Sequence, residues 1–195
     1  SSSPGKGFGS FQTSHRLPAE AVRDNALAVS GILVRDIGGP SVKPYQPVGY
    51  YRHLNFPTRK YAHHTDDRQW RRGIYIHWQR QFLHPMMKAF DAPRREECAA
   101  RRSRSNTPLS SLVLLNDPTF VKAAQALTTR IIKEGGTDTD ARIQFAYRVV
   151  LSRNPDSFEQ TTARKFLENE SGGETTSWNG FSRVLLNLSE TYTRR

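Results

Sequence analysis

The sequence predicts a mainly α-helical protein: a helical bundle with a long ordered irregular loop and at most one short pair of β-strands. Apolar residues recur at helical spacing through the C-terminal half. Two of these segments open with a helix-start signal in which Thr or Asp precedes Pro. Residues 37–72, in contrast, show no sustained periodicity and are rich in Gly, Pro and aromatic residues. A long irregular stretch of this kind predicts a functional or draped loop beside the helices.

The chain has 195 residues, which is the length of one domain with a sizeable core. We therefore expect residues 16–195 to form a single helical domain. Residues 1–15 are rich in Ser and Gly, so we expect them to be a disordered linker or the end of a fragment. They show no signal-peptide pattern. The longest strongly apolar run, residues 109–115, is far shorter than the roughly 20 residues that span a bilayer.

The charge of the chain is concentrated in its middle. The net charge is +11, and residues 52–104 hold 13 Lys/Arg against 5 Asp/Glu, a net of +8, which leaves +3 for the remainder. Of the 29 cationic residues 22 are arginine, and the planar guanidinium suits defined pairing with carboxylate, phosphate or sulfate. This favours specific ion pairs or a defined anion site over loose nucleic-acid binding. The only cysteine, Cys98, cannot form an intrachain disulfide.

A first helix is predicted from residue 18 to residue 30, with Gly31 as its stop. Its apolar stripe contains Val22, Ala26 and Val29. The charged residues of this helix, expected to face solvent, are Glu20, Arg23 and Asp24.

The irregular segment 37–72 is predicted to be ordered, because disordered segments are poor in aromatic residues and this one is rich in them. We expect it to lie over the helical body. It also contains His63, His64, Asp66 and Asp67, which have metal-ligand chemistry but no recognised ligand spacing. An exposed polar turn is the favoured interpretation, and no metal ligand is assigned.

Residues 74–78 are the best strand candidate, because they are β-branched and aromatic. The strand could pair near Tyr50 and Tyr51 or run extended through the core. His77 and His84 lie in or near it without triad or metal spacing, so we expect interior hydrogen-bonded histidines.

A short helix is predicted from residue 93 to residue 100, with Asp91 just before its start and acids in its first turn. Cys98 would lie on this helix as a small buried residue. The alternative is a reactive thiolate, since nearby arginines lower a thiol pKa, but no general base is evident.

The strongest helix signals follow. Thr107-Pro108 opens a helix over residues 109–115, and Asp117-Pro118 opens one over residues 118–134. Three further helices are predicted over residues 140–152, 157–169 and 176–192, joined by short turns as in an antiparallel bundle.

Several segments carry a family resemblance: RLPAEAVRDNALAVSG, GGPSVKPYQP, WRRGIYIHW, HPMMKAFDAPRREECAARRSRSNTPL, LVLLNDPTFVKAA and LLNLSE. Over about residues 16–190 the chain resembles the C-terminal part of a planctomycete domain of unknown function. That domain occurs in large exported proteins with an N-terminal cytochrome-c-like domain, some of which carry lectin-like modules. The resemblance implies a periplasmic or extracellular location and a setting in redox or polysaccharide processing.

This chain departs from the family setting in two ways. It contains no CxxCH sequence, so we expect no cofactor here, and haem c would belong only to an N-terminal domain outside this sequence. From the resemblance we also expect the front part of the family domain to lie outside this sequence. The positions that match the family pattern are Arg72, Trp78, His84, Asp91, Arg95, Glu96, Cys98, Arg101, Arg104, Asn106 and Thr107.

Three functions remain open, and the sequence does not decide whether the protein is an enzyme. The first is a non-catalytic structural or interaction domain, in which arginines pair with Asp91, Glu96, Glu97 and acids of the first helix. Its partners would be other domains of the parent chain.

The second is a binding or hydrolytic site for an anionic, sulfated or uronic glycan, with Asp91 or Glu96 as the catalytic acid or base. The candidate binding residues are Arg72, Trp78, His84, Arg95, Arg101, Arg104 and Asn106. The third, nucleic-acid binding, has charge in its favour but no motif.

Overall fold

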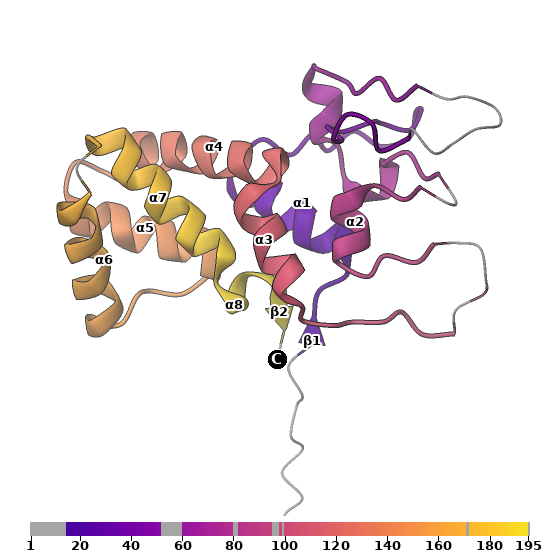
Figure 1. Cartoon of the computed structure of the whole chain (residues 1–195). Coiled ribbons are helices and arrows are strands. Elements are labelled where there is room, and N and C mark those ends of the chain that lie inside the picture. Colours follow the sequence, from indigo (N-terminus) through magenta and orange to yellow (C-terminus); the bar gives the residue numbers. More distant parts are fainter. Residues whose placement is uncertain are drawn as a thin grey trace, which may run out of the picture.

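The computed structural model describes residues 15–51, 60–79, 82–94, 98, 100–170 and 172–194 of the chain. Over these residues the protein is mainly α-helical, which confirms the predicted fold class (Figure 1). The α-helices are α1 (Ala19–Val29), α2 (Pro85–Ala89), α3 (Pro108–Asn116), α4 (Pro118–Glu134), α5 (Thr139–Leu151), α6 (Ser157–Asn169), α7 (Glu174–Asn187) and α8 (Ser189–Tyr192). Two 3-10 turns, η1 (Asp67–Trp70) and η2 (Gly73–Tyr75), and two strands, β1 (His15–Arg16) and β2 (Thr193–Arg194), complete the described elements.

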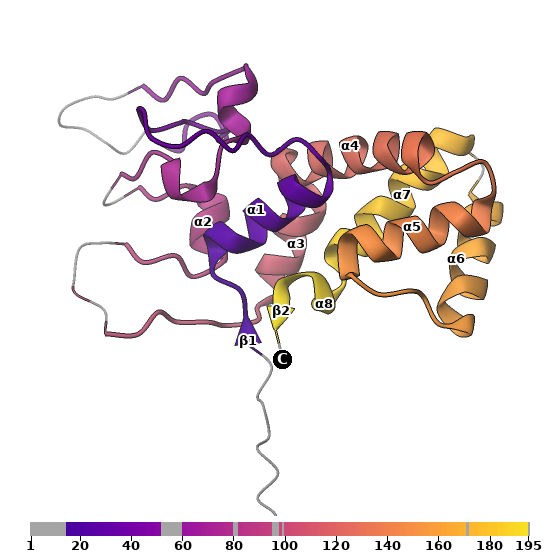
Figure 2. The same ribbon diagram turned by 180° about the vertical axis from the view of Figure 1, so that it is seen from behind.

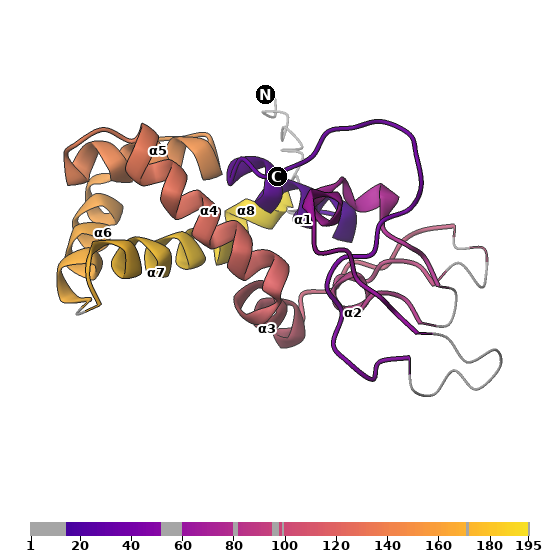
Figure 3. The same ribbon diagram turned by 90° about the horizontal axis from the view of Figure 1, so that it is seen from above.

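Helix α4 is the centre of the helical body. It runs from the group formed by α5, α6 and α7 to α3. Helices α1 and α2 lie on the side of α4 that is away from this group (Figure 3). Its predicted apolar stripe is buried, and it packs most extensively against α7. The stripe consists of Phe120, Ala124, Leu127 and Ile131, each at most 1% exposed. None of the described helices is both long and apolar enough to cross a bilayer.

The helix starts predicted from capping signals are confirmed. The Thr107 side chain accepts a hydrogen bond from the Ser110 amide at 3.3 Å, and Asp117 accepts one from the Thr119 amide at 2.8 Å. The predicted last helix is divided, because Leu188 adopts an extended conformation between α7 and α8.

Strands β1 and β2 pair antiparallel, which brings the two ends of the described chain together (Figure 2). The Leu17 amide donates to the Tyr192 carbonyl at 2.8 Å, and the Asn25 side chain donates to the Thr191 carbonyl at 2.9 Å. The predicted strand over residues 74–78 is wrong. Residues 73–75 form η2, and only Ile76 makes a bridge, with Val42. Ile74 is 70% exposed, so strand propensity had no neighbouring surface to act against.

Other predictions of local structure had mixed outcomes. The predicted helix over residues 93–100 is not formed at residues 93, 94, 98 and 100, and its remaining positions lie outside the described residues. The predicted linker also lies outside them, apart from His15 in β1. Helix α2, which was not predicted, starts with Pro85 and buries Met86 and Met87.

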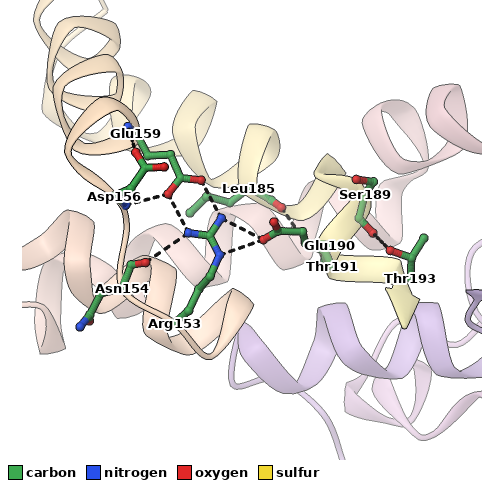
Figure 4. Close-up of polar contacts among 9 residues, drawn as sticks. All are labelled: Arg153, Asn154, Asp156, Glu159, Leu185, Ser189, Glu190, Thr191 and Thr193. Carbon is green, nitrogen blue, oxygen red and sulfur yellow. Dashed lines mark hydrogen bonds and ion pairs between the residues drawn. The ribbon is translucent and has the colours of Figure 1, made fainter. Parts of the chain in front are cut away.

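A charged cluster ties the turn after α5 to α6 and α8 (Figure 4). The Arg153 guanidinium donates to both carboxylate oxygens of Glu159, at 2.6 and 2.7 Å, and to Glu190 at 3.0 and 3.1 Å. Hydrogen bonds from Arg153 hold the pKa of Glu159 below its usual value, against a smaller opposing effect of burial. Arg153 therefore links three helices through one side chain.

We predict that Arg153→Ala lowers the free energy of unfolding by about 1 kcal/mol at pH 7, because a bidentate ion pair within a network contributes more stability than an isolated surface pair. A carboxylate with a lowered folded-state pKa stabilises the protein above its unfolded pKa and loses this effect as the pH falls. The difference from wild type should therefore shrink below about pH 4, measured by urea unfolding. Arg148→Ala, on the exposed side of α5, is the control and should change stability by less than about 0.5 kcal/mol. A pH-independent loss would contradict the ion-pair explanation.

Candidate functional site

A buried arginine on α1 positions the irregular segment. Arg23 is 0% exposed, and its guanidinium donates to the Arg71 carbonyl at 2.6 Å and to the Gln69 carbonyl. Its ion pair with Asp24 is longer, at 3.7 Å. Burial lowers the pKa of Arg23 to about 10, so the side chain remains charged at neutral pH. The prediction that Arg23 faces solvent is wrong, because carbonyl groups of the irregular segment replace water around its charge.

Helix α1 also meets η2, directly after the irregular segment, at Gly73. A side chain at this position would begin 2.9 Å from the Glu20 Cα, so only glycine allows the contact. The Gly73 amide donates to the Asp24 carboxylate at 2.6 Å. Burial raises the pKa of Asp24, although this hydrogen bond and Arg23 oppose the rise. Backbone and side-chain groups of α1 thus fix the position of η2.

Arg71 organises the preceding loop from inside. Its guanidinium donates to the carbonyls of Asp36 at 3.2 Å, Pro40 at 3.1 Å and Gly38, and lies 4.2 Å from the centre of the Tyr75 ring. The loop therefore closes around a cation. A hydrogen bond from one aromatic hydroxyl attaches this segment to its surroundings, and a hydrogen bond from another joins two residues of the segment itself. They join Tyr50 to the Leu83 carbonyl and Tyr61 to the Pro44 carbonyl.

A third buried arginine holds the next segment. Arg16, in β1, is 4% exposed and pairs with Asp91 at 2.6 Å. The same Asp91 oxygen accepts hydrogen bonds from the Ser105 amide and hydroxyl, both at 2.7 Å. Asp91 therefore joins β1 to the segment that leads into α3. We call the described residues 91–94, 98 and 100–107 the arginine arm (Figure 1).

Asp91 does not cap a helix, contrary to the expectation from its neighbours. Its φ of 54° places it in the left-handed region directly after α2. Burial alone would raise the pKa of this carboxyl, but the hydrogen bonds from Ser105 and the charge of Arg16 outweigh it and lower the pKa. A general acid at neutral pH needs a raised pKa instead. The geometry gives Asp91 the properties of an anchor.

The arginine arm encloses a hollow of about 330 Å³ beside α2. Four cationic side chains line it together with Asp91. Arg102 is partly neutralised, because it donates to both carboxylate oxygens of Glu20 at 3.1 Å. Lys88, Arg94 and Arg101 are exposed and have no ion pair within the described residues. The full lining consists of Lys88, Asp91, Ala92, Pro93, Arg94, Arg101, Arg102 and Ser103.

A larger hollow of about 720 Å³ lies between the end of α1 and α4. It too is cationic, with Arg35, Lys122, Arg130 and Lys133 against Glu134. Both helices end there, however, and the partial negative charge of helix C-termini opposes an anion and is offset by such cations. Arg130 is also committed to Glu134 at 3.0 Å and to the Val29 carbonyl at 2.9 Å. The arm hollow is therefore the stronger anion-binding candidate.

A third hollow, of about 560 Å³, lies at the start of α5 beside α6 and α7. Arginines pair with two of its five acidic residues. Asp140 pairs with Arg164 at 2.5 Å, and Glu174 pairs with Arg142. No group of His, Cys, Asp and Glu side chains among the described residues is arranged to hold a metal ion.

The residues predicted to form a site are not gathered in one place. Arg101 lines the hollow, and Arg104 lies on the same arm, exposed. Arg72 and Asn106 are also exposed, whereas His84 is 2% exposed. Trp78 is half-buried and packs against the core. Arg95, Glu96 and Glu97 lie outside the described residues.

Cys98 is exposed, so the prediction of a small buried residue is wrong. The helix expected to bury it is not formed at the described positions around it. His84 agrees with its structural interpretation, because its Nε2 lies 2.7 Å from the Tyr45 carbonyl oxygen in the interior.

Sequence analysis missed the burial of Arg16, Arg23 and Arg71 and three cationic residues of the hollow, Lys88, Arg94 and Arg102. One signal could have revealed Arg23. It lies between Ala19 and Leu27, four residues from each, and therefore on the buried stripe of α1. No comparable local signal marks Arg16 or Arg71, whose partners are distant in the sequence.

We predict that Arg23→Met lowers the free energy of unfolding by about 2 kcal/mol, because it leaves two carbonyl groups without their donor in the interior. Arg104→Ala and Arg101→Met, on the exposed arm, should each cost less than about 0.5 kcal/mol. Chemical unfolding followed by circular dichroism measures all three. Equal losses of stability for Arg23→Met and Arg104→Ala would show that the charge of the arm also stabilises the fold.

Burial lowers the pKa of His84, and the hydrogen bond to Tyr45 opposes this only in part. A histidine whose folded-state pKa lies below its unfolded value of about 6.5 destabilises the protein as the pH falls below that unfolded value. We predict that His84→Gln flattens the stability profile between about pH 7 and pH 5. His63→Gln, at an exposed position, should leave the profile unchanged. An unchanged profile for His84→Gln would assign the acid sensitivity to other groups.

Comparison with known proteins identifies a family. No curated protein and no solved structure matches the chain. Residues 3–167 match the family described as PSD1, protein of unknown function (DUF1553). The match covers most of the chain, includes the buried arginines and the arginine arm, and agrees with the resemblance seen in the sequence. The chain therefore belongs to the PSD1 (DUF1553) family.

Proposed function

We propose that this chain is a non-catalytic interaction domain of a larger exported protein, and that it binds an anionic partner through the arm hollow. One observation carries the proposal. Arg16, Arg23 and Arg71 are buried and donate hydrogen bonds within the fold, whereas Arg94, Arg101 and Arg104 on the arm are exposed and have no ion pair among the described residues. Exposed, converging guanidinium groups suit carboxylate, sulfate or phosphate groups on a partner.

The state of Asp91 supports a binding role over a catalytic one. Its carboxylate is held by Arg16 and Ser105 and has a lowered pKa, so it is a poor general acid. A glycosidase also needs a second carboxylate at a defined separation, and the other candidate, Glu96, lies outside the described residues. A hydrolytic site for an anionic glycan therefore remains the alternative.

The family resemblance supports the setting of the proposal. It points to a periplasmic or extracellular protein of several domains, so the anionic partner would be another domain of the parent chain or an acidic polysaccharide. The proposal includes no cofactor, because covalent attachment of haem c requires two cysteines and the chain has one. Nucleic acid is the disfavoured anion, since no recognised binding motif accompanies the charge.

We predict that the protein binds sulfated dextran, polygalacturonate or polyglutamate, and that Arg94→Ala/Arg101→Ala weakens this binding about tenfold, which corresponds to about 1.4 kcal/mol. Both side chains are exposed, so the variant should remain folded. Lys122→Ala/Lys133→Ala removes the same charge from the α4 hollow and is the matched control. Isothermal titration at fixed salt measures all three proteins.

Two results would contradict the proposal. If no polyanion binds the wild type, the arm hollow is not an anion site. If the control variant loses as much affinity as the arm variant, binding reflects net charge alone. Short duplex DNA belongs in the same experiment. Tighter binding of DNA with a steep salt dependence would favour the nucleic-acid alternative.

A further inference from the structure

Helix α3 exposes an unusual amount of apolar surface. Its sequence, PLSSLVLLN, is apolar around most of the helix, yet only Ser110 and Leu114 are buried. Leu109 is 57% exposed and Leu112 is 55% exposed. These residues are three apart and therefore lie on one face of the helix. Single exposed leucines are ordinary, but two on one short helix form a small apolar patch.

This face is held in place from behind. Helix α3 packs against α2, α4 and α7. Its first turn is fixed by a reciprocal capping box between Thr107 and Ser110, and the Arg183 guanidinium donates to the Leu115 carbonyl at 2.7 Å near its end. The two leucines are consequently presented on a rigid element, as anchor residues at binding surfaces commonly are.

The helix that carries this apolar face follows the arginine arm along the chain. The arm leads along the chain into the N-terminus of α3 (Figure 1). Arg101 and Arg104 lie on this approach, are exposed, and have no ion pair within the described residues. The N-terminus of α3 adds partial positive charge. The surface is therefore cationic at one end and apolar at the other.

We propose that the arginine arm and the Leu109–Leu112 face together bind an acidic amphipathic helix of a protein partner. This inference rests on the function proposed above and names the class of partner. Acidic side chains of the partner would meet Arg101, Arg104 and the hollow, while its apolar stripe would cover the two leucines. Apolar residues at this i, i+3 spacing form the stripe through which one helix packs against another.

Other occupants fit the surface less well. An acidic glycan would satisfy the arginines but has no apolar stripe for the leucines. A membrane surface would use a wider apolar face, usually with aromatic residues, than two leucines on a nine-residue helix provide. A second copy of the chain carries the same net charge of +11 and would be repelled.

The test uses two synthetic acidic peptides of identical Glu and Leu composition. In one, the leucines fall on a single helical face, and in the other they are scattered around the helix. We expect the wild-type chain to bind the first about tenfold more tightly than the second in fluorescence anisotropy. Leu109→Ser/Leu112→Ser should abolish this preference. Phe158→Ser is the matched control, because Phe158 is 78% exposed on α6, at the other end of the helical body.

The outcomes separate this inference from the function on which it rests. If both peptides and sulfated dextran bind with equal strength to wild type and leucine variant, and Arg94→Ala/Arg101→Ala weakens them all, the anion site stands and the helical partner is wrong. If nothing binds, both fall. Anionic phospholipid vesicles provide the remaining outcome. If they bind the wild type, if this binding requires the two leucines, and if the vesicles compete with the peptide, the surface is a membrane-contact site and the proposal is overturned.

Discussion

The irregular half of this protein depends on a cation that has no access to water. The Arg23 guanidinium is enclosed, and its hydrogen bonds go to backbone carbonyls on either side of Trp70. Removing a charge from water costs free energy unless other groups solvate it, and carbonyl dipoles do so here. The converse also holds, because these carbonyls have no partner in a helix or sheet ladder and require a donor. The guanidinium therefore supplies the donors that the carbonyls need, and the carbonyls solvate its charge. This contact joins α1 to η1.

Arg71 extends the same principle to the preceding loop. The carbonyls of residues 36, 38 and 40 converge on one guanidinium, whose planar group also lies against the Tyr75 ring, an arrangement that a lysine ammonium does not offer. Two glycines with positive φ, Gly38 and Gly39, allow the backbone to bend around the cation. The Gly38 amide in turn donates to the Tyr75 hydroxyl at 2.9 Å. An abundance of arginine is thus a means of ordering a chain that lacks regular secondary structure.

What the sequence predicted correctly was local in origin. The Thr107 and Asp117 caps act within three residues, and the apolar stripe of α4 repeats every three or four, so both can be read from a short window. The candidate site was harder to predict from the sequence. Asp91 looks like a cap from its neighbours, but its conformation and charge are set by Arg16 and Ser105, which lie 75 and 14 positions away. The strand expected over residues 74–78 did not form, because only Ile76 within it makes a bridge, with Val42, and strand propensity takes effect only where partners are supplied along the segment.

The position of the arginine arm is coupled to the pairing of β1 with β2. Strands of two residues contribute few hydrogen bonds, so their stability must come from side chains around them. Arg16 supplies this, because it belongs to β1, lies 5.3 Å from the centre of the Phe90 ring and binds Asp91. Asp91 in turn holds Ser105, two residues before the cap of α3. Arg16 therefore belongs both to the strand that meets β2 and to the ion pair that anchors the arm. Through Asp91 and Ser105 these contacts reach the start of α3, so one arginine connects the two ends of the described chain to the surface that we assign to binding.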